Sequence, residues 1–342
     1  MSASHQQPSP ELFFETANAY QRSACLKAAV DLDLFTAIAE GCSEPAALAS
    51  RCNASVRGVR ILCEFLAAVG FLTKDGDGFG LTPDSAFFLD RNSPAYLGGA
   101  LEFLLSDLQK AGFDEFAAAV RKGGTALEGD GAMSPNHPLW VKFARGMAPL
   151  MTLAAQHIAG LATNGRPPSK VLDLAAGHGA FGIEIAKRNP GARIVAVDWP
   201  AVLEVAEENA ARAGVADRYQ TLPGNAFELD FGNGYDMALL TNFLHHFDPP
   251  SCVGLLRKVH AALNPAGSVI TLEFIPNEDR VSPPAPAMFS AVMLAGTLGG
   301  QAYTFSELRG MFEEAGFPAN ELHEVEGAPQ RIIVSRKQLG EG

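Results

Sequence analysis

Apolar residues recur at helical spacing through the first part of the chain. The stretch Leu12–Val30 places apolar side chains every three to four positions, which predicts a helix. Ser43-Glu44-Pro45 is typical of a cap followed by a first helical turn. Ser55 is expected to cap another helix, Val56–Val69, which Gly70 ends. The chain is therefore expected to begin with a helical region.

A short hairpin follows these helices in the pattern. Phe71–Thr73 and Phe79–Thr82 are expected to be strands around a turn of Asp and Gly residues. Helices followed by such a hairpin predict a winged helix, a fold that often binds DNA. The expected recognition helix carries only Arg57 and Arg60 as cations, which is little charge for phosphate contacts. We therefore favour a dimer interface for the long apolar helices and keep DNA binding as an alternative.

The middle of the chain, Leu101–Ala162, keeps a helical pattern. The stretch Gly123–His137 interrupts it and is interpreted as a loop over a site. Arg166-Pro167-Pro168 is interpreted as a linker, because the pattern changes after it. Three parts are thus expected: a helical winged-helix domain over 1–105, connecting helices with a substrate lid over 106–165, and a further domain over 166–342.

Strands alternate with helices in this last part. The expected strands are 171–174, 194–198, 219–222, 237–241, 269–274 and 331–335. The expected helices are 181–188, 201–213, 251–262 and 306–315. This alternation predicts an α/β fold with a doubly wound, mostly parallel sheet. Such sheets bind ligands at the carboxyl ends of their strands.

Composition limits the partners of this chain. The 342 residues include 26 Lys and Arg against 38 Asp and Glu, a net charge of −12. Because an acidic chain repels phosphate backbones and anionic lipids, nucleic-acid and membrane partners are not expected. We find neither a secretory signal at the N-terminus nor an apolar run long enough for a membrane helix. The five cysteines form no CxxC motif, which predicts buried thiols in a cytoplasmic protein.

A glycine motif stands between the first strand of the sheet and the next helix. Residues 177–182, GHGAFG, satisfy GxGxxG in the strand-to-helix context that this motif requires. Glycine lets the backbone turn sharply and approach a ligand closely. Asp198 ends the following strand, where a carboxylate can accept hydrogen bonds from both hydroxyls of a ribose. The motif predicts a nucleoside-containing cofactor and leaves its kind open.

Asp173 separates two classes of cofactor. It lies in the first strand of the sheet, shortly before Gly177. A dinucleotide would bring an anionic pyrophosphate close to this carboxylate, whereas S-adenosylmethionine brings a cationic ammonium and a sulfonium. The charge of Asp173 therefore favours S-adenosylmethionine over NAD(P). A cap of the following turn is the structural alternative for this residue.

Ordered motifs resemble those of class I S-adenosylmethionine-dependent methyltransferases. They are Val171–Gly179, Asp198–Pro200, Gly224–Phe227 and Leu244–Phe247. Together with the helical front end, nearly the whole chain resembles the caffeate-type and bacterial polyketide-type O-methyltransferases. The resemblance implies a Rossmann-like α/β domain, an N-terminal winged-helix dimerisation domain, S-adenosylmethionine as the cofactor and a homodimer.

The resemblance also implies which residues contact the cofactor. In the family, glycines of the first motif line the methionine part, and acidic residues after the second and third strands reach ribose and adenine. Asn225 stands at the third-strand position, where its amide oxygen can still accept a hydrogen bond from adenine. The implied cofactor-binding residues are Asp173, Gly177, Gly179, Asp198, Trp199, Asn225, Ala226, Phe227 and Thr241.

A histidine pair after the fourth strand is the candidate acid–base group. A phenol or alcohol acceptor must lose a proton, and histidine titrates close to neutral pH. The family base is the first residue of a His-Asp-Trp triplet, which corresponds to His245, with His246 and Phe247 at the next two positions. A solvated pair facing a turn is the alternative. A metal site is not expected, because we find no further Cys/His cluster at ligand spacing.

Two carboxylates orient this base in the family. Glu273, at the end of the fifth strand, corresponds to the first of them. Ala302 stands at the second position, so one carboxylate is missing, and the nearby Glu307 belongs to a capping box that starts at Thr304. This departure motivates other reactions on the same fold: N-methylation, decarboxylation, hydroxylation or a pericyclic step.

The acceptor is expected among apolar and adaptable side chains. The expected lining residues are Phe143, Met147, Asn242, His246, Met288, Phe289, Met293 and Tyr303. The sequence therefore predicts an S-adenosylmethionine-dependent O-methyltransferase that acts on a small aromatic or polyketide-like hydroxyl, with His245 and Glu273 as catalytic residues. A DNA-binding or ligand-sensing regulator is the alternative of another class.

Overall fold

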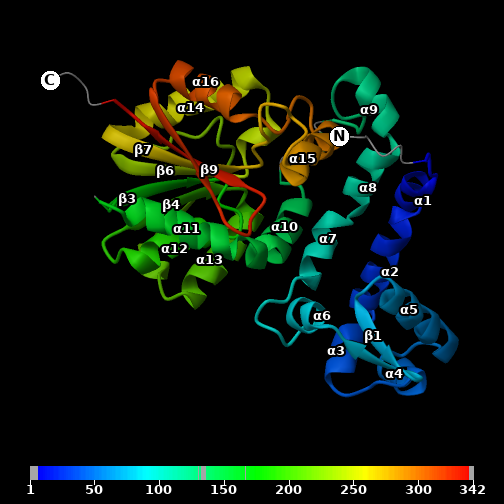
Figure 1. Cartoon of the computed structure of the whole chain (residues 1–342). Coiled ribbons are helices and arrows are strands. Elements are labelled where there is room, and N and C mark those ends of the chain that lie inside the picture. Colours follow the sequence, from blue (N-terminus) through cyan, green and yellow to red (C-terminus); the bar gives the residue numbers. More distant parts are fainter. Residues whose placement is uncertain (1–6, 130, 132–135, 166, 339–342) are drawn as a thin grey trace, which may run out of the picture. The chain divides into compact units, whose positions relative to one another are not determined.

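Two compact units make up the chain, residues 1–101 and residues 102–342. The computed structural model describes residues 7–129, 131, 136–165 and 167–338 (Figure 1). Arg166 of the expected linker and part of the expected loop 123–137 lie outside the described residues. The three-part division of the chain stays a prediction. None of the described helices is long and apolar enough to cross a membrane.

The N-terminal unit is a helical domain with one hairpin. Its helices are α1 (Glu11–Ala17), α2 (Ala19–Asp31), α3 (Leu34–Ala39), α4 (Pro45–Arg51), α5 (Val56–Ala68) and α6 (Pro83–Phe88). The hairpin pairs β1 (Leu72–Asp75) with β2 (Gly78–Leu81) in antiparallel register. The helix expected from Val56 and the hairpin are thus confirmed.

Local signals decide where these helices begin. Ser55 Oγ accepts a hydrogen bond of 3.1 Å from the Gly58 amide and caps α5, as predicted. The side chain of Glu44 makes no cap bond, and α4 begins at Pro45, whose fixed φ suits a first helical position. The single helix expected over Leu12–Val30 is wrong. It divides into α1 and α2 at Asn18, a residue type that favours turns.

The larger unit begins with helices and continues as an α/β sheet domain. The first helices are α7 (Leu101–Leu104), α8 (Asp107–Asp114), α9 (Phe116–Lys122), α10 (Leu139–Met147) and α11 (Thr152–Thr163). The later ones are α12 (Ala180–Arg188), α13 (Pro200–Arg212), α14 (Pro249–Ala262), α15 (Pro284–Gly296) and α16 (Phe305–Glu314).

Seven strands form one sheet in the order β5-β4-β3-β6-β7-β9-β8. They are β3 (Lys170–Leu174), β4 (Arg193–Asp198), β5 (Tyr219–Pro223), β6 (Tyr235–Thr241), β7 (Leu263–Glu273), β8 (Ala319–Glu324) and β9 (Arg331–Arg336). The first five strands in this order, from β5 through β4, β3 and β6 to β7, pair in parallel. Strands β9 and β8 then continue the sheet in antiparallel pairing. The predicted doubly wound, mostly parallel sheet is confirmed.

Helices cover both faces of this sheet. Helices α11, α12 and α13 lie on one face, and α14 and α16 lie on the other (Figure 1). Each face buries its own cluster of apolar residues, because successive side chains of a strand point to opposite sides. Since β3 is buried on both faces, its sequence reads as a nearly continuous apolar run around Asp173.

Two elements of this unit were not predicted. Helix α15 is apolar around most of its circumference, so it lacks the periodic pattern of a surface helix. Strand β8 is polar, its residues are exposed or half-buried, and its pairing with β9 at the edge of the sheet makes it a strand. Tertiary contacts, not local preference, decide both elements.

Candidate active site

Five loops at the carboxyl edge of the parallel strands form the candidate active site. They follow β3, β4, β5, β6 and β7 and hold residues 175–179, 198–199, 224–227, 242–246 and 274. Because parallel strands end at the same edge of a sheet, these distant parts of the sequence meet there. Two neighbouring cavities lie between the loops and the helices around them.

The loop after β3 makes the tight turn that the glycine motif predicts. Gly177 and Gly179 have φ values of 57° and 74°, which glycine adopts without strain. A β-carbon on Gly179 would stand 2.7 Å from the Tyr219 hydroxyl, so the position has no space for a side chain. Ala175 has a φ of 52° in the same loop and lines both cavities. Strain of this kind in a non-glycine residue is typical of functional sites.

Asp198 fastens this loop to the end of β4. Its Oδ2 accepts a hydrogen bond of 2.8 Å from the Gly177 amide, and its Oδ1 accepts one of 2.7 Å from the Trp199 amide. Burial raises the pKa of the carboxyl to about 6 in spite of both bonds. Asp198 lines both cavities, and each of its oxygens keeps a lone pair for a further donor. It can therefore accept hydrogen bonds from a ligand that spans the two cavities.

Asp173 lies beneath the glycine loop and lines neither cavity. It is fully buried, and its Oδ2 accepts a hydrogen bond of 3.2 Å from the Gly182 amide in the first turn of α12. Burial raises the pKa of this carboxyl to about 7. The geometry gives Asp173 the capping role that was its structural alternative. A contact between Asp173 and a cofactor stays a prediction.

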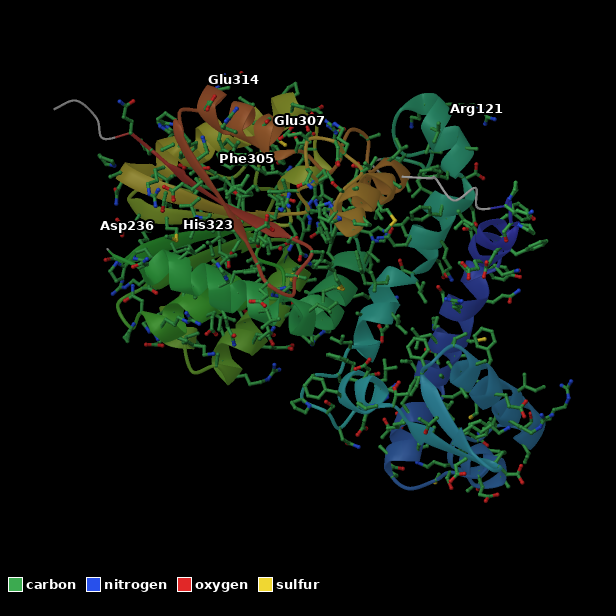
Figure 2. All side chains as sticks on the ribbon, in the orientation of Figure 1. Arg121, Asp236, Phe305, Glu307, Glu314 and His323 are labelled. Atoms are coloured by element: carbon green, nitrogen blue, oxygen red, sulfur yellow. The ribbon has the colours of Figure 1, made fainter. Side chains whose placement is uncertain are left out.

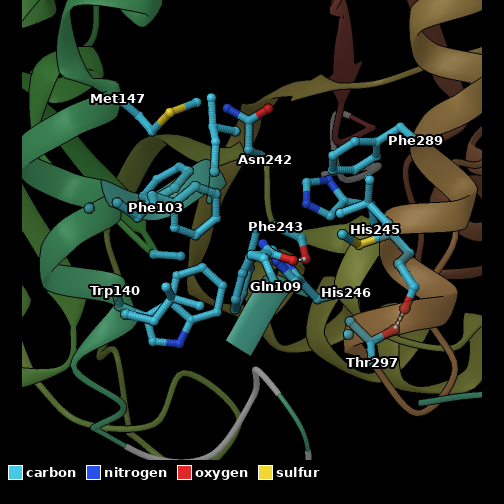
Figure 3. Close-up of a pocket in the computed structure, with 18 of the residues that line it drawn as sticks. Phe103, Gln109, Trp140, Met147, Asn242, Phe243, His245, His246, Phe289 and Thr297 are labelled. Atoms are coloured by element: carbon cyan, nitrogen blue, oxygen red, sulfur yellow. Dashed lines mark hydrogen bonds between the residues drawn. The ribbon is translucent and has the colours of Figure 1, made fainter. Parts of the chain in front are cut away.

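His245 and Glu273 form a buried pair. Nδ1 of His245 is hydrogen-bonded to Glu273 Oε2, while Glu273 Oε1 accepts bonds from the amides of Phe243 (2.9 Å) and Leu244 (2.8 Å). The backbone thus holds the carboxylate, and the carboxylate holds the imidazole. Because Nδ1 is bonded to Glu273, Nε2 on the other side of the ring is left for a ligand in the larger cavity, which His245 lines (Figure 3). Since His245 is only 3% exposed, the alternative of a solvated pair is wrong for it.

His246 lies where the two cavities meet and lines both. Its Nδ1 is 3.1 Å from the Phe243 carbonyl, and its ring meets the Trp140 ring edge to face at 5.4 Å. Burial, helped by the neighbouring His245, lowers the pKa of His246 well below its usual value. His246 is therefore neutral, with Nδ1–H donating to the carbonyl.

The larger cavity has a volume of about 610 Å³ and aromatic walls. One wall comes from Phe103, Trp140 and Phe143, whose rings contact one another. On the other side, the Phe289 ring stacks on Phe274 at 3.9 Å and meets the His245 ring at 4.8 Å. Figure 3 shows Phe103 and Trp140 facing His245 and Phe289 across the space. Such walls suit a flat aromatic ligand.

The second cavity has a volume of about 330 Å³ and includes the loop after β5. Asn225, Ala226 and Phe227 line it together with Asp198 and Trp199. Asn225 Oδ1 accepts a hydrogen bond of 3.0 Å from the Phe227 amide, which folds this loop into a turn. The structure therefore brings the predicted ribose and adenine residues into one cavity beside the glycine loop.

Most predicted acceptor residues line the larger cavity. They are Phe143, Met147, Asn242, His246, Phe289 and Met293, and the predicted cofactor residues Gly177 and Thr241 line it too. Gly179 and Glu273 lie behind the cavity walls and line neither cavity.

Two of the residues predicted to line the acceptor site do not line either cavity. Met288 is 66% exposed on α15 and does not line either cavity, because its side chain is on the outer side of the helix. Tyr303 is buried below the histidine loop, where its hydroxyl donates to the Phe247 carbonyl at 2.5 Å. It supports the loop and lines no cavity.

The segment after α15 supplies no second carboxylate for His245. Ala302 is fully buried, and its amide donates to Ser290 Oγ at 3.1 Å. Glu307 forms the predicted capping box with Thr304 at the start of α16 (Figure 2) and pairs with Arg280. Within the described part of the chain, no group of three His, Cys, Asp or Glu side chains could hold a metal ion.

Several residues of the cavity walls were not predicted from the sequence. Phe103, Trp140, Phe243 and Phe274 line the larger cavity. Trp140 belongs to the helical pattern of α10, where a ring that faces a cavity looks the same as a ring in the core. Phe274 directly follows Glu273 at the end of β7, and this strand-end position was the signal that could have found it.

The sheet order is that of a Rossmann-like fold, whose ligands bind at the carboxyl edge of the strands, where the two cavities lie. Residues 119–318 match the O-methyltransferase domain, and residues 14–91 match the O-methyltransferase dimerisation domain. The chain therefore belongs to the O-methyltransferase family, a family of S-adenosylmethionine-dependent enzymes. This family assignment favours the enzyme over the alternative of a DNA-binding or ligand-sensing regulator.

Known proteins resemble the chain over nearly its whole length. A 3-hydroxy-5-methyl-1-naphthoate 3-O-methyltransferase from Streptomyces sahachiroi is 27% identical over 310 residues, which cover 90% of this chain and 89% of the relative. A solved structure from Nostoc punctiforme, assigned as a candidate O-methyltransferase, is 54% identical, has a TM-score of 0.94 and covers 97% of this chain and 100% of that one. Human N-acetylserotonin methyltransferase, solved with S-adenosylmethionine, shares the fold at 23% identity, with a TM-score of 0.83 and coverage of 98% and 100%.

Proposed function

We propose that the chain transfers the methyl group of S-adenosylmethionine to a hydroxyl of a small aromatic or polyketide-like acceptor, with His245 as the general base. The observation that carries this proposal is the His245–Glu273 pair. It fixes Nδ1 of the imidazole and leaves Nε2 for a group in a cavity with aromatic walls. A hydroxyl placed there can lose its proton to a neutral imidazole.

The second cavity and the glycine loop fit the cofactor. Asp198 would accept hydrogen bonds from the ribose hydroxyls, Asn225 and Phe227 would flank the adenine, and Gly177 would approach the methionine part. The lone pairs left on Asp198 are an independent sign of fit, since ribose supplies two donors. S-adenosylmethionine supplies a methyl group already activated on a sulfonium.

The residues of this chain then have three tasks. The aromatic walls around Trp140 and Phe289 align the acceptor ring, and alignment for in-line displacement contributes roughly 7–11 kcal/mol at best. His245 takes the hydroxyl proton on Nε2. Glu273 accepts the Nδ1–H bond throughout, which selects the tautomer with a free Nε2 lone pair and stabilises the imidazolium that forms.

A different reaction in the same cavities is the second candidate. Among the described residues, Glu273 is the only carboxylate bonded to His245, since Ala302 stands where the family has a second one. N-methylation needs less base strength from the enzyme, and decarboxylation, hydroxylation or a pericyclic step would use the cofactor differently. The acceptor assay described below distinguishes O-methylation from N-methylation by the atom that carries the label.

We also propose that the chain is a homodimer. The dimerisation-domain match covers residues 14–91, from within α1 to just beyond α6. Helices α1 and α2 expose Leu12, Phe13, Phe14 and Tyr20, each at least 57% accessible. Exposed apolar side chains at this density are typical of a surface that another chain covers. Light scattering after gel filtration tests the dimer, and a monomer at micromolar concentration contradicts it.

Calorimetry is expected to separate the two cofactor classes. S-adenosylhomocysteine should bind far more tightly than NAD, because beyond the Asp198 ribose site the larger cavity offers apolar walls, against which a dinucleotide would have to bury its charged pyrophosphate. The measurement is a pair of titrations of the same protein at pH 8. Tighter binding of NAD would overturn the placement of the cofactor.

An acceptor screen tests the reaction. The protein is incubated with methyl-labelled S-adenosylmethionine and a panel of hydroxylated aromatics, each paired with its amino analogue and its O-methyl ether. We expect label on the oxygen of two- and three-ring phenols and none on the ethers, since the 610 Å³ cavity fits ligands of drug size. Label on the amino analogues alone would favour N-methylation instead.

A further inference from the structure

A lysine on α14 holds the loop that forms the wall of the second cavity. Lys258 Nζ donates hydrogen bonds of 3.1 Å to the carbonyls of Ala226 and Phe227. The residues that carry these two carbonyls both line the cavity. Lys258 itself does not line it, so its effect on a ligand must pass through the loop.

The position of Lys258 is well determined by its surroundings. Its ammonium group lies 4.4 Å from the centre of the Phe231 ring, which adds a cation–π contact. Glu228 and Asp230 stabilise its charge, while burial lowers the pKa of the lysine. The carbonyls of a short turn lack the partners that a helix would give them. An ammonium group has three donors and can therefore bind two adjacent carbonyls at once.

Other bonds hold the beginning of the loop, among them those from the Glu228 (3.0 Å) and Leu229 (2.9 Å) amides to the Asn225 carbonyl. Asn225 fixes its beginning through the bond from its Oδ1 to the Phe227 amide, and Gly224 donates to the Asp198 carbonyl at 2.9 Å. The Phe227 ring is held by contact with the Phe247 ring at 4.7 Å. Without Lys258, the carbonyls of Ala226 and Phe227 would lose their side-chain donor and would turn to water.

We propose that Lys258 is a positioning residue for the cofactor: it sets the wall of the adenine end of the cavity by binding the Ala226 and Phe227 carbonyls. This inference rests on the proposed placement of the cofactor. It predicts an effect on cofactor affinity and none on the acceptor, since the larger cavity and the His245–Glu273 pair have no contact with Lys258.

The chain offers a matched control at Lys337. Lys337 Nζ also donates to two backbone carbonyls, those of His260 (2.8 Å) and Leu263 (2.9 Å), and lines neither cavity. Both lysines are half-buried. Removing the ammonium from either one therefore costs similar bonds in the same unit, and only Lys258 anchors a cavity wall.

The experiment compares Lys258→Met with Lys337→Met in the full-length protein. Methionine keeps an apolar stem of similar length and removes the donors. Both variants should melt at lower temperature than the wild type. For Lys258→Met, the Kd of S-adenosylhomocysteine and the KM of S-adenosylmethionine should rise about tenfold, while kcat and the KM of the acceptor stay within about twofold. For Lys337→Met, the Kd should not change.

An unchanged Kd in Lys258→Met, or an equal rise in Lys337→Met, would overturn the proposal. If Lys258→Met does not fold, Lys258→Gln, which keeps one donor, should raise the Kd about threefold. The Asp198 variants described in the Discussion test the cofactor placement independently. Loss of affinity in those variants without any in the Lys258 variants leaves the placement intact and removes the role of Lys258.

Discussion

Replacing His245 with alanine is expected to lower kcat for a phenolic acceptor by about 10²–10⁴-fold and to leave the affinity for S-adenosylhomocysteine unchanged. The physical reason is that Nε2 of His245 is the proton acceptor that the larger cavity offers next to the aromatic walls. The cofactor affinity is unaffected because the proposed cofactor contacts come from other loops. Steady-state kinetics at saturating cofactor and calorimetry measure the two quantities.

Glu273→Gln is the matched test of the tautomer. Glutamine can keep the bonds from the Phe243 and Leu244 amides with its oxygen, and its NH₂ group then faces His245 Nδ1. That arrangement forces the proton onto Nε2, so the imidazole can no longer accept the hydroxyl proton. We expect kcat to fall by about 10³-fold while the fold is kept.

The pH profile distinguishes a base from a merely structural histidine. An acceptor with a more acidic phenol should be methylated by His245→Ala with a smaller loss, because it reaches the cavity already ionised. Equal rates for the wild type and His245→Ala across pH 6–9 would show that the proton is removed elsewhere or needs no enzyme base.

Replacing Asp198 with alanine is expected to weaken binding of S-adenosylhomocysteine by about 1–3 kcal/mol, or roughly 5- to 150-fold, because ribose hydroxyls lose their acceptor. Calorimetry at pH 8 measures the change. The Gly177 and Trp199 amides also lose their partner, so Asp198→Asn, which keeps one oxygen, is the milder variant. An unchanged Kd in both variants would place the ribose elsewhere.

Binding to the wild type should also depend on pH. Burial raises the pKa of Asp198 to about 6 in the free protein, and ribose donors favour the ionised form, so binding releases a proton below that pH. The Kd should therefore be constant above about pH 7 and rise as the pH falls through about 6. The Asp198→Asn variant should lose this component, while any contribution from Asp173, whose pKa is about 7, remains in both proteins.

The stability of the ligand-free protein should depend on pH in the opposite direction to cofactor binding. The pKa of the Asp198 carboxyl is higher in the folded state than in the unfolded chain. The free energy of unfolding therefore begins to fall when the pH exceeds the pKa of the unfolded chain, and the loss is complete above the pKa of the folded state. Without ligand, the melting temperature of the wild type should therefore contain a component that falls as the pH rises from about 4 through about 6. Asp198→Asn should lack this component, because an amide does not titrate.

The sequence predicted those parts of the fold that depend on interactions between residues close together in the chain. The alternation of strands and helices after residue 170 predicted the parallel sheet, because a strand buried on both faces must be apolar throughout. The glycine motif predicted its turn, since the φ values at Gly177 and Gly179 suit glycine. Helix α15 and strand β8 were not predicted, because packing determines the first and pairing at the sheet edge determines the second.

The candidate site was predictable where a residue follows a strand. His245, Asp198 and Asn225 follow β6, β4 and β5 or end them, so the topology alone gathers them at one edge. Residues on the surrounding helices were less certain. Met288 and Phe289 are neighbours in α15, yet Phe289 lines the cavity and Met288 is exposed. Only the rotation of the helix against the sheet separates them, and the sequence does not encode it locally.

By itself, the sequence determined the α/β class, the glycine turn, the histidine after β6 and the family resemblance, because each depends on residues close in the chain. Only the tertiary structure decided which charges are free to act. The sequence assigned both Asp173 and Asp198 to the cofactor, but Asp173 is buried under α12 and Asp198 opens to both cavities. The physical reason is that desolvation and hydrogen bonding depend on all the elements packed around a side chain, and not on its neighbours in sequence.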